Sequence, residues 1–244
     1  MDAKEAGELG DRLADLAAAG EWETAYALLQ PRLSERIPFR LLDRVGERMA
    51  QAPPAALDPL LGRISAGGAM GGWPVIGAAL GRRLKVDLGG AYAHCRTFVI
   101  EGDSWYATDI LGERVCGPGL VINFAGGVET LAAWRTDENY WVRRAVGVAV
   151  HLWTKRAHGD PSKSEQAGEL LAFLEPMFSE RQREAVKGVG WGLKTIGHYY
   201  PDLQAAWLRR QVVEIGRPHS KLMLNKALTY LPAETRRKIL RPQE

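Results

Sequence analysis

The chain has 244 residues, of which 46% are hydrophobic and 25% are charged, as in a soluble globular protein with a substantial core. No apolar run approaches the roughly 20 residues of a membrane span, and the acidic N-terminus lacks the order of a signal peptide. Cys95 and Cys116 form no CxxC pair, so no disulfide framework is indicated, and we expect a reducing, cytoplasmic setting without a membrane partner.

The net charge of +3 conceals an uneven distribution of charged residues. Residues 131–244 contain 19 Lys and Arg against 12 Asp and Glu, or +7, whereas residues 1–130 contain 13 against 17, or −4. A basic C-terminal half suits an anionic partner such as a nucleic acid backbone. A solvated basic surface without any partner explains the charge alone equally well.

Helical periodicity begins near the N-terminus, where Leu9, Leu13, Leu16 and Ala17 recur at i, i+4, i+7 and i+8, and a glycine follows as a stop. The same pattern, interrupted by prolines, predicts four N-terminal helices, at residues 4–19, 22–30, 39–51 and 55–65. The glycine-rich stretch 66–72 is predicted to be a loop.

Trp73-Pro74 opens the next helix, with the proline near the first turn, where its missing N–H costs nothing. Further helices are predicted at residues 74–85, 88–100, 103–114, 126–136, 139–157, 165–175, 180–198, 201–215 and 218–231. Thr97–Ile100 is apolar and β-branched, but it is short and lies inside a helical pattern, so no strand is expected. Many helices with short connectors are typical of an all-α fold, an α-solenoid of stacked antiparallel helix pairs. We therefore expect one repeat domain over residues 1–244.

The first candidate site lies in the predicted helix 103–114. Trp105 and Asp109 are spaced i, i+4, so both side chains share one helix face. Asp103 or Ser104 can serve as the N-cap. A half-buried tryptophan beside a solvated carboxylate is the structural alternative.

Two arginines form the second candidate site. Arg143 and Arg144 follow Trp141 near the start of a predicted helix, and adjacent residues point about 100° apart. One guanidinium can therefore reach a phosphate, with help from the helix N-terminus. Alternatively, Asp137 and Glu138 hold both arginines in intramolecular ion pairs.

The third candidate site is Trp191, which lies between Gly190 and Gly192, with Lys194 one turn later. Glycine costs about 1 kcal/mol in a helix relative to alanine. Two glycines beside one tryptophan therefore favour a functional interpretation, in which the small neighbours leave the indole face open to another chain or a ligand. Glycine-mediated helix packing with Trp191 in the core is the alternative. We assign the other tryptophans of the C-terminal half to packing: Trp134, Trp141, Trp153 and Trp207.

Other chemistries fit poorly. The five histidines show no HExxH or other paired spacing, so we expect no metal. The sequence has no GxxxxGK[ST] motif, no complete GxGxxG motif after a strand and no GxSxG elbow. No cofactor is therefore expected.

Three segments together resemble the AlkD-like family of alkylpurine DNA glycosylases, which are HEAT-like repeat DNA alkylation repair proteins. The segments are DSWYATDILG, TDENYWVRRAVGV and VKGVGWGLKTIGHYYPD. The second begins with the capping loop and Val-Arg-Arg-Ala start of a HEAT-like second helix. The resemblance spans about residues 70–231, whereas residues 1–66 form divergent N-terminal helices.

The resemblance implies a monofunctional glycosylase that hydrolyses the N-glycosidic bond of cationic N3- and N7-alkylpurines in duplex DNA. It implies neither strand cleavage nor a base-flipping pocket. By position, Asp109, Trp105 and Trp191 are the catalytic candidates. Arg144 is the phosphate-binding candidate, with Arg143 and Lys194 beside it.

This chemistry agrees with the residue types. Alkylation makes the purine a cationic leaving group, and charge then builds on the sugar as an oxocarbenium ion. A carboxylate such as Asp109 stabilises that cation and orients water. Lys194 stands where the family often has arginine, which keeps the charge but loses the bidentate fork.

The resemblance implies a monomer that acts on double-stranded DNA containing alkylated purines, in the cytoplasm and associated with the nucleoid when bound. The alternative is a non-catalytic HEAT-like module that binds DNA or a protein through its concave face. A glycosylase for bulky adducts is a third interpretation.

Overall fold

The structure, a computed structural model, describes residues 1–241 and divides into two compact units, Met1–Val115 and Cys116–Glu244. Every regular element among the described residues is helical, which confirms the predicted all-α architecture. None of these helices is both long and apolar enough to cross a membrane. The expectation of one repeat domain over the whole chain stays a prediction.

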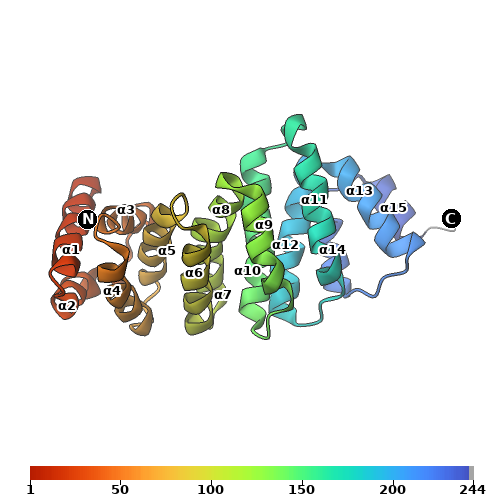
Figure 1. Cartoon of the computed structure of the whole chain (residues 1–244). Helices are drawn as coiled ribbons and strands as arrows, with labels where there is room; N and C mark the ends of the chain where they lie inside the picture. The colour runs from red at the N-terminus through yellow and green to blue at the C-terminus, as the bar shows by residue number, and fades with distance from the viewer. Residues whose placement is uncertain (242–244) are drawn as a thin grey trace. The chain divides into compact units, whose positions relative to one another are not determined.

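The first unit is built from two layers of helices (Figure 1). Its helices are α1 (Ala3–Ala18), α2 (Trp22–Leu33), α3 (Phe39–Met49), α4 (Pro54–Ala66), α5 (Gly72–Arg83), α6 (Leu88–Gly102) and α7 (Trp105–Leu111). The odd-numbered helices pack in the order α1, α3, α5, α7, and the even-numbered ones in the order α2, α4, α6. Each helix therefore packs against the helix two places along the chain, as an α-solenoid requires.

The second unit repeats this arrangement (Figure 1). Its helices are α8 (Gly117–Ile122), α9 (Phe124–Ala132), α10 (Tyr140–Ala157), α11 (Ser164–Leu174), α12 (Arg183–Tyr199), α13 (Pro201–Arg209), α14 (Lys221–Ala227) and α15 (Ala233–Leu240). One layer runs α8, α10, α12, α14, and α11, α13 and α15 follow one another in the other. Helix α10 is the centre of the unit, because its residues from Arg144 to Thr154 are all buried.

Pro31 does not end helix α2, contrary to the prediction from the sequence. Helix α2 continues through Pro31 to Leu33, although the predicted helix ends at residue 30. Leu29 and Leu33 are both buried, so the apolar stripe runs across the proline. Burial of this stripe outweighs the one backbone hydrogen bond that proline removes.

The predicted helix 103–114 is shorter in the structure. Asp103 has a left-handed φ of 35° at the end of α6, so Ser104 is the N-cap and α7 begins at Trp105. A π-helical turn, Gly112–Cys116, follows α7. Helices α8 and α15 were not predicted, because short segments next to Pro118 and Pro232 give little periodicity.

A close approach of two backbones fixes the contact between α10 and α12. A Cβ atom at Gly147 would overlap the carbonyl of Gly188, and a Cβ at Gly192 would lie 2.8 Å from the Gly147 oxygen. Helices that approach this closely need glycine at the crossing point.

We expect Gly147→Ala to lower the free energy of unfolding by about 3 kcal/mol, because backbone atoms cannot yield to the new methyl group. Gly168→Ala is the matched control, since nothing lies within 4 Å of a Cβ at that position of α11. This control should gain about 0.5–1 kcal/mol from its lower unfolded-state entropy. Urea denaturation of both variants measures the difference, and two equal shifts would contradict the packing described.

Candidate functional site

Helix α7 presents Trp105 and Asp109 on one face. The Ala107 amide donates to the Ser104 hydroxyl oxygen at 3.4 Å, and the Thr108 hydroxyl donates to the Ser104 carbonyl at 2.9 Å. These bonds define the first turn and hence the direction of Trp105. The Trp105 side chain is 58% exposed, and Asp109 is half-buried. An indole this exposed contributes little to the core, so it is available to a ligand.

Helix α12 carries a basic and aromatic stripe. Only every third or fourth residue in its central part reaches solvent, because the rest of the helix is buried. The residues of this stripe, here called the α12 stripe, are Glu184, Lys187, Trp191, Lys194 and His198. From Lys187 to His198 it extends about 16 Å at 1.5 Å per residue. That length matches about five base-pair steps of duplex DNA at 3.4 Å each.

The cations of the stripe are held by neighbours. The Lys187 ammonium donates to a Glu184 carboxylate oxygen at 2.6 Å. The Lys194 ammonium lies 5.2 Å from the centre of the Tyr230 ring, which in turn lies 4.6 Å from the His198 ring. Cation–π contact orders the lysine without neutralising its charge.

His151 is a residue that the sequence analysis missed, and it lies beneath Trp191. The two rings stack at a centroid distance of 3.9 Å. Thr195 donates its hydroxyl proton to the Trp191 carbonyl at 2.9 Å, so its oxygen accepts from His151 Nδ1 at 2.7 Å. This network assigns the Nδ1–H tautomer and fixes the tilt of the indole. His151 belongs to no sequence motif, and its spacing of 40 residues from Trp191 gave no signal.

The stacked imidazole is neutral over a wide pH range. Burial, together with the positive charge of Lys155, lowers the pKa of His151 to about 4. In the unfolded chain the pKa is near 6.5. Between these values the unfolded chain binds a proton that the folded chain does not, so folding is destabilised as pH falls from 6.5 to about 4.

We therefore expect the free energy of unfolding to fall more steeply in wild type than in His151→Phe within this pH window. The excess slope should be about 1.4 kcal/mol per pH unit, whereas the two curves should run parallel above pH 7. Chemical denaturation at a series of pH values gives both curves. Parallel curves throughout would show that His151 is protonated in the folded protein.

The glycines beside Trp191 serve helix packing. A Cβ at Gly190 would lie 2.6 Å from the Lys226 side chain of α14, and Gly192 faces the backbone of α10. The interpretation that small neighbours open the indole face is wrong. The alternative was glycine-mediated helix packing with Trp191 in the core. It is right about the glycines, but Trp191 itself is half-buried and lies on the α12 stripe. Of the tryptophans assigned to packing, Trp134, Trp141 and Trp153 are buried, and Trp207 is half-buried with its edge against Phe178.

Arg143 is engaged inside the second unit. Its Nε donates to Glu180 at 2.7 Å, and its Nη1 donates to the carbonyls of Asp137 and Glu138 at 2.6 and 3.1 Å. Burial raises the pKa of Glu180, but bonds from Arg143 and from the Gln182 and Arg181 amides outweigh burial and bring it below its usual value. The carboxylate partner of Arg143 is thus Glu180, and the arginine contacts Asp137 and Glu138 through their backbone carbonyls.

Arg144 is buried, with 7% of its surface exposed. Its Nη1 donates to the Glu184 carboxylate at 3.2 Å and to the Glu184 carbonyl at 3.3 Å, and its guanidinium lies 6.0 Å from the Trp141 ring. Both arginines therefore form intramolecular ion pairs, as the alternative interpretation expected in kind, but the partners are Glu180 and Glu184. The lysines of the α12 stripe are better placed than Arg144 to meet a phosphate.

The six predicted site residues are shared between the units. Trp105 and Asp109 belong to the first unit, whereas Trp191, Lys194 and the two arginines belong to the second. Within residues 1–241 no group of three or more His, Cys, Asp or Glu side chains is arranged to hold a metal ion.

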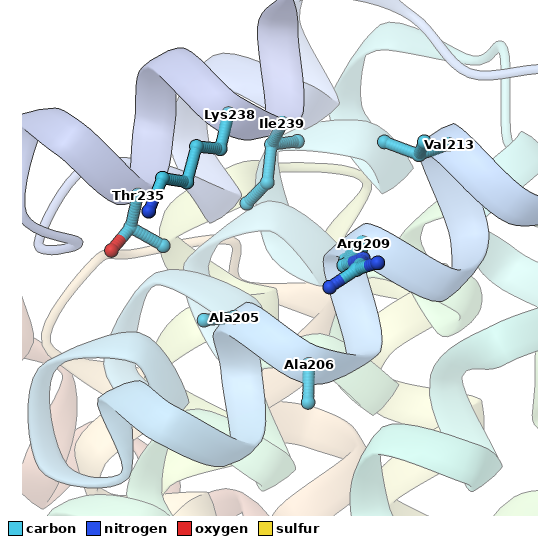
Figure 2. A pocket seen from close by; sticks show the side chains of 7 residues that line it. All are labelled: Ala205, Ala206, Arg209, Val213, Thr235, Lys238 and Ile239. Carbon is cyan, nitrogen blue, oxygen red and sulfur yellow. The ribbon is translucent and has the colours of Figure 1, made fainter. Parts of the chain in front are cut away.

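A groove between α13 and α15, with a volume of about 490 Å³, contains none of these residues (Figure 2). Thr235, Lys238 and Ile239 come from α15. Ala205, Ala206 and Arg209 come from α13, and Val213 lies on the turn that follows α13. No carboxylate, thiol or imidazole lines the groove, so it offers no general base.

Comparison with known proteins adds one positive result. The family model of the DNA alkylation repair enzymes matches residues 75–231, well over half of the chain. The matched segment runs from α5 to the end of α14 and contains all six predicted site residues. No curated protein and no solved structure matches the chain.

Proposed function

Because this chain belongs to the family of DNA alkylation repair enzymes, we propose that it is a monofunctional DNA glycosylase. Its substrates are cationic N3- and N7-alkylpurines in duplex DNA, and its product is the free base beside an intact, abasic strand. We propose further that it acts as a monomer, in the cytoplasm. The main support is the pair of Trp105 and Asp109, an exposed indole with a carboxylate one turn away on α7.

The reaction needs little from the protein beyond charge stabilisation and water. The alkylated purine leaves with the electron pair of the glycosidic bond, so its positive charge is lost from the base and appears on the deoxyribose. Asp109 stabilises this oxocarbenium ion and accepts a proton from the water that adds to C1′. Trp105, on the same helix as Asp109, contacts the sugar and excludes other water, with a cation–π contribution of about 0.5–2 kcal/mol.

Contact with the DNA backbone is assigned to Lys187 and Lys194 on the α12 stripe. Lys194 is ordered by the Tyr230 ring, and Lys187 is ordered by its ion pair with Glu184. Arg143 and Arg144 support this surface from beneath, since each pairs with a glutamate close to or on α12. The arginines therefore act on DNA indirectly, by fixing the start of α12.

Release of bases tests the function. Wild-type protein is incubated with methylated duplex, and free 7-methylguanine and 3-methyladenine are measured by chromatography. We expect both bases to appear while the strands stay uncut until hot alkali cleaves the abasic sites. Binding to duplex without release of either base would instead support a non-catalytic DNA-binding module.

Removal of one stripe lysine should change the salt dependence of binding. We expect Lys194→Ala to reduce the slope of log K against log salt by about 0.9, the value for one lost phosphate contact. The control Lys4→Ala removes an exposed lysine of α1 and should leave the slope unchanged. Titration of a fluorescent duplex at several salt concentrations gives the slopes, and equal slopes for both variants would remove Lys194 from the interface.

A further inference from the structure

The groove between α13 and α15 has a helical wall on each side, and its labelled side chains come from both walls (Figure 2). Along one wall, Ala205, Arg209 and Val213 follow one another at i, i+4 and i+8, from α13 into the π-helical turn Arg210–Glu214. Eight residues at 1.5 Å each give this wall a length of about 12 Å. The groove is therefore long enough for two side chains that lie one helical turn apart.

The floor of the groove is apolar. Four of the seven lining side chains are hydrocarbon only, namely those of Ala205, Ala206, Val213 and Ile239. Ile215 and Leu240, each within two residues of a lining residue, are about half exposed. Apolar side chains gathered at one place on a surface favour a ligand with apolar groups. A DNA backbone has no such groups to fill the floor, so the groove suits a protein segment better than a nucleic acid.

The surroundings of the groove are strongly basic. Residues 201–241 contain nine Lys and Arg against three Asp and Glu, or +6. Of the two cations in the lining, Arg209 pairs with Glu214 at 3.5 Å. Lys238 pairs with Glu234 at 2.8 Å, and all four side chains are exposed. Exposed ion pairs contribute little to stability, so carboxylates of a partner can replace them.

Three further arginines beside the groove add to this charge. Arg210, Arg236 and Arg237 are exposed, and each is next to a lining residue in the sequence. None of the three forms an ion pair within residues 1–241. Their charge is therefore available to an acidic partner and attracts it over a distance.

The groove is separate from the features that the chain shares with its family. Helix α15 begins at Ala233, after the match to the family model ends at residue 231. The groove also belongs to the layer of α11, α13 and α15, whereas the α12 stripe belongs to the layer of α8, α10, α12 and α14. A ligand in the groove and a duplex on the α12 stripe therefore contact different layers of the unit.

We propose that the groove between α13 and α15 is the docking site for an acidic amphipathic helix of a partner protein. Apolar side chains of this helix at i and i+4 fill the floor, and its carboxylates meet Arg209 and Lys238. An amphipathic helix in an apolar groove is a common mode of recognition, and the charges select acidic partners. This proposal does not depend on the glycosylase function.

Fluorescence titration of the full chain with three labelled peptides tests the groove. Each peptide has about 15 residues, a length at which isolated helices begin to form. The first has leucine at i and i+4 and glutamate or glutamine elsewhere. The second has alanine in place of leucine, and the third has lysine in place of glutamate. We expect the first peptide to bind at least about tenfold more tightly than either of the others. No binding of the first peptide, or equal binding of the second, would overturn the proposal.

Two pairs of variants localise the contact. Lys238→Glu should weaken the first peptide about tenfold, whereas Lys221→Glu, an equal change at an exposed position of α14, should weaken it less than about twofold. Ala206→Trp fills the groove from an exposed position and should abolish binding. Its control, Ala172→Trp at an exposed position of α11, should bind as wild type. Equal effects within either pair would exclude the groove as the binding site.

Competition with unmethylated duplex separates the groove from the DNA-binding surface. Saturating duplex should change the affinity of the first peptide less than about twofold, because the α12 stripe lies in the other layer. Displacement of the peptide by duplex would overturn the proposal and make the groove part of the DNA interface. A protein that binds the peptide but releases no alkylated base would disprove the glycosylase function and not the docking site.

Discussion

Asp109→Asn is expected to slow release of 7-methylguanine from duplex DNA by about 100-fold, the loss typical for one electrostatic or general-base group. The amide has the same shape as the carboxylate but neither stabilises the oxocarbenium ion nor accepts a proton from water. Single-turnover kinetics measures the step directly. Binding of methylated duplex should change by less than about twofold, since Asp109 meets the charge that develops during reaction.

Asp15→Asn provides the control for this substitution. Asp15 is an exposed carboxylate on α1 of the same unit, so its loss changes net charge equally without touching α7. Its rate should equal that of wild type. A full rate in Asp109→Asn would remove the carboxylate from the mechanism, whereas loss of duplex binding in this variant would make Asp109 a binding residue.

Arg144→Ala is expected to lower the free energy of unfolding by about 2–3 kcal/mol, because it leaves the partly buried Glu184 carboxylate with Lys187 but without its guanidinium partner and removes packing from Trp141. Arg183→Ala, at an exposed position one residue from Glu184, should change stability by less than about 0.5 kcal/mol. Urea denaturation at neutral pH measures both variants.

A double variant separates the two possible roles of Arg144. Combining Arg144→Ala with Glu184→Ala removes both partners of the pair, so the double variant should lose less stability than the sum of the two single variants. If Arg144→Ala were as stable as wild type but bound methylated duplex poorly, the arginine would be a phosphate contact and the ion pair described here would not matter for folding.

Much of the fold was predictable because periodicity is a local property. Leu13 and Ala17 are buried and Leu9 is half-buried beside them, so their spacing gives the inward face of α1 without reference to the rest of the chain. The same reasoning failed at Pro31, where buried leucines on both sides carry the helix onward. It also gave no sign of the π-helical turn Gly112–Cys116, since a single extra residue in a turn leaves no repeat to detect.

The site was predictable only where its determinants are close in sequence. The spacing of Trp105 and Asp109 gave their common face, and the structure adds the exposure of the indole. The carboxylate partners of Arg143 and Arg144 lie 37 and 40 residues away in the sequence. The sequence alone therefore did not decide whether these arginines bind a phosphate or form intramolecular ion pairs. The orientation of the His151 ring depends on a hydrogen bond to Thr195, 44 residues away. No local sequence pattern could therefore predict that His151 lies against Trp191.

The α12 stripe, and not the pair of arginines, is the proposed contact with the DNA backbone. Arg144 was the preferred phosphate ligand because of its place in the Asn-x-Trp-x-x-Arg segment. Because Arg144 is buried and ion-paired, we propose a structural role for it and assign the contact with the backbone to Lys187 and Lys194. The role proposed for Asp109 depends on α7 alone, so the burial of Arg144 does not affect it.

The most direct test is the rate constant of 7-methylguanine release with wild-type protein in excess over methylated duplex. We predict a rate well above spontaneous depurination of the same duplex, with strands uncut and with most of the increase lost in Asp109→Asn. Release at the spontaneous rate by folded wild-type protein that demonstrably binds the duplex would contradict a glycosylase and leave a DNA-binding module.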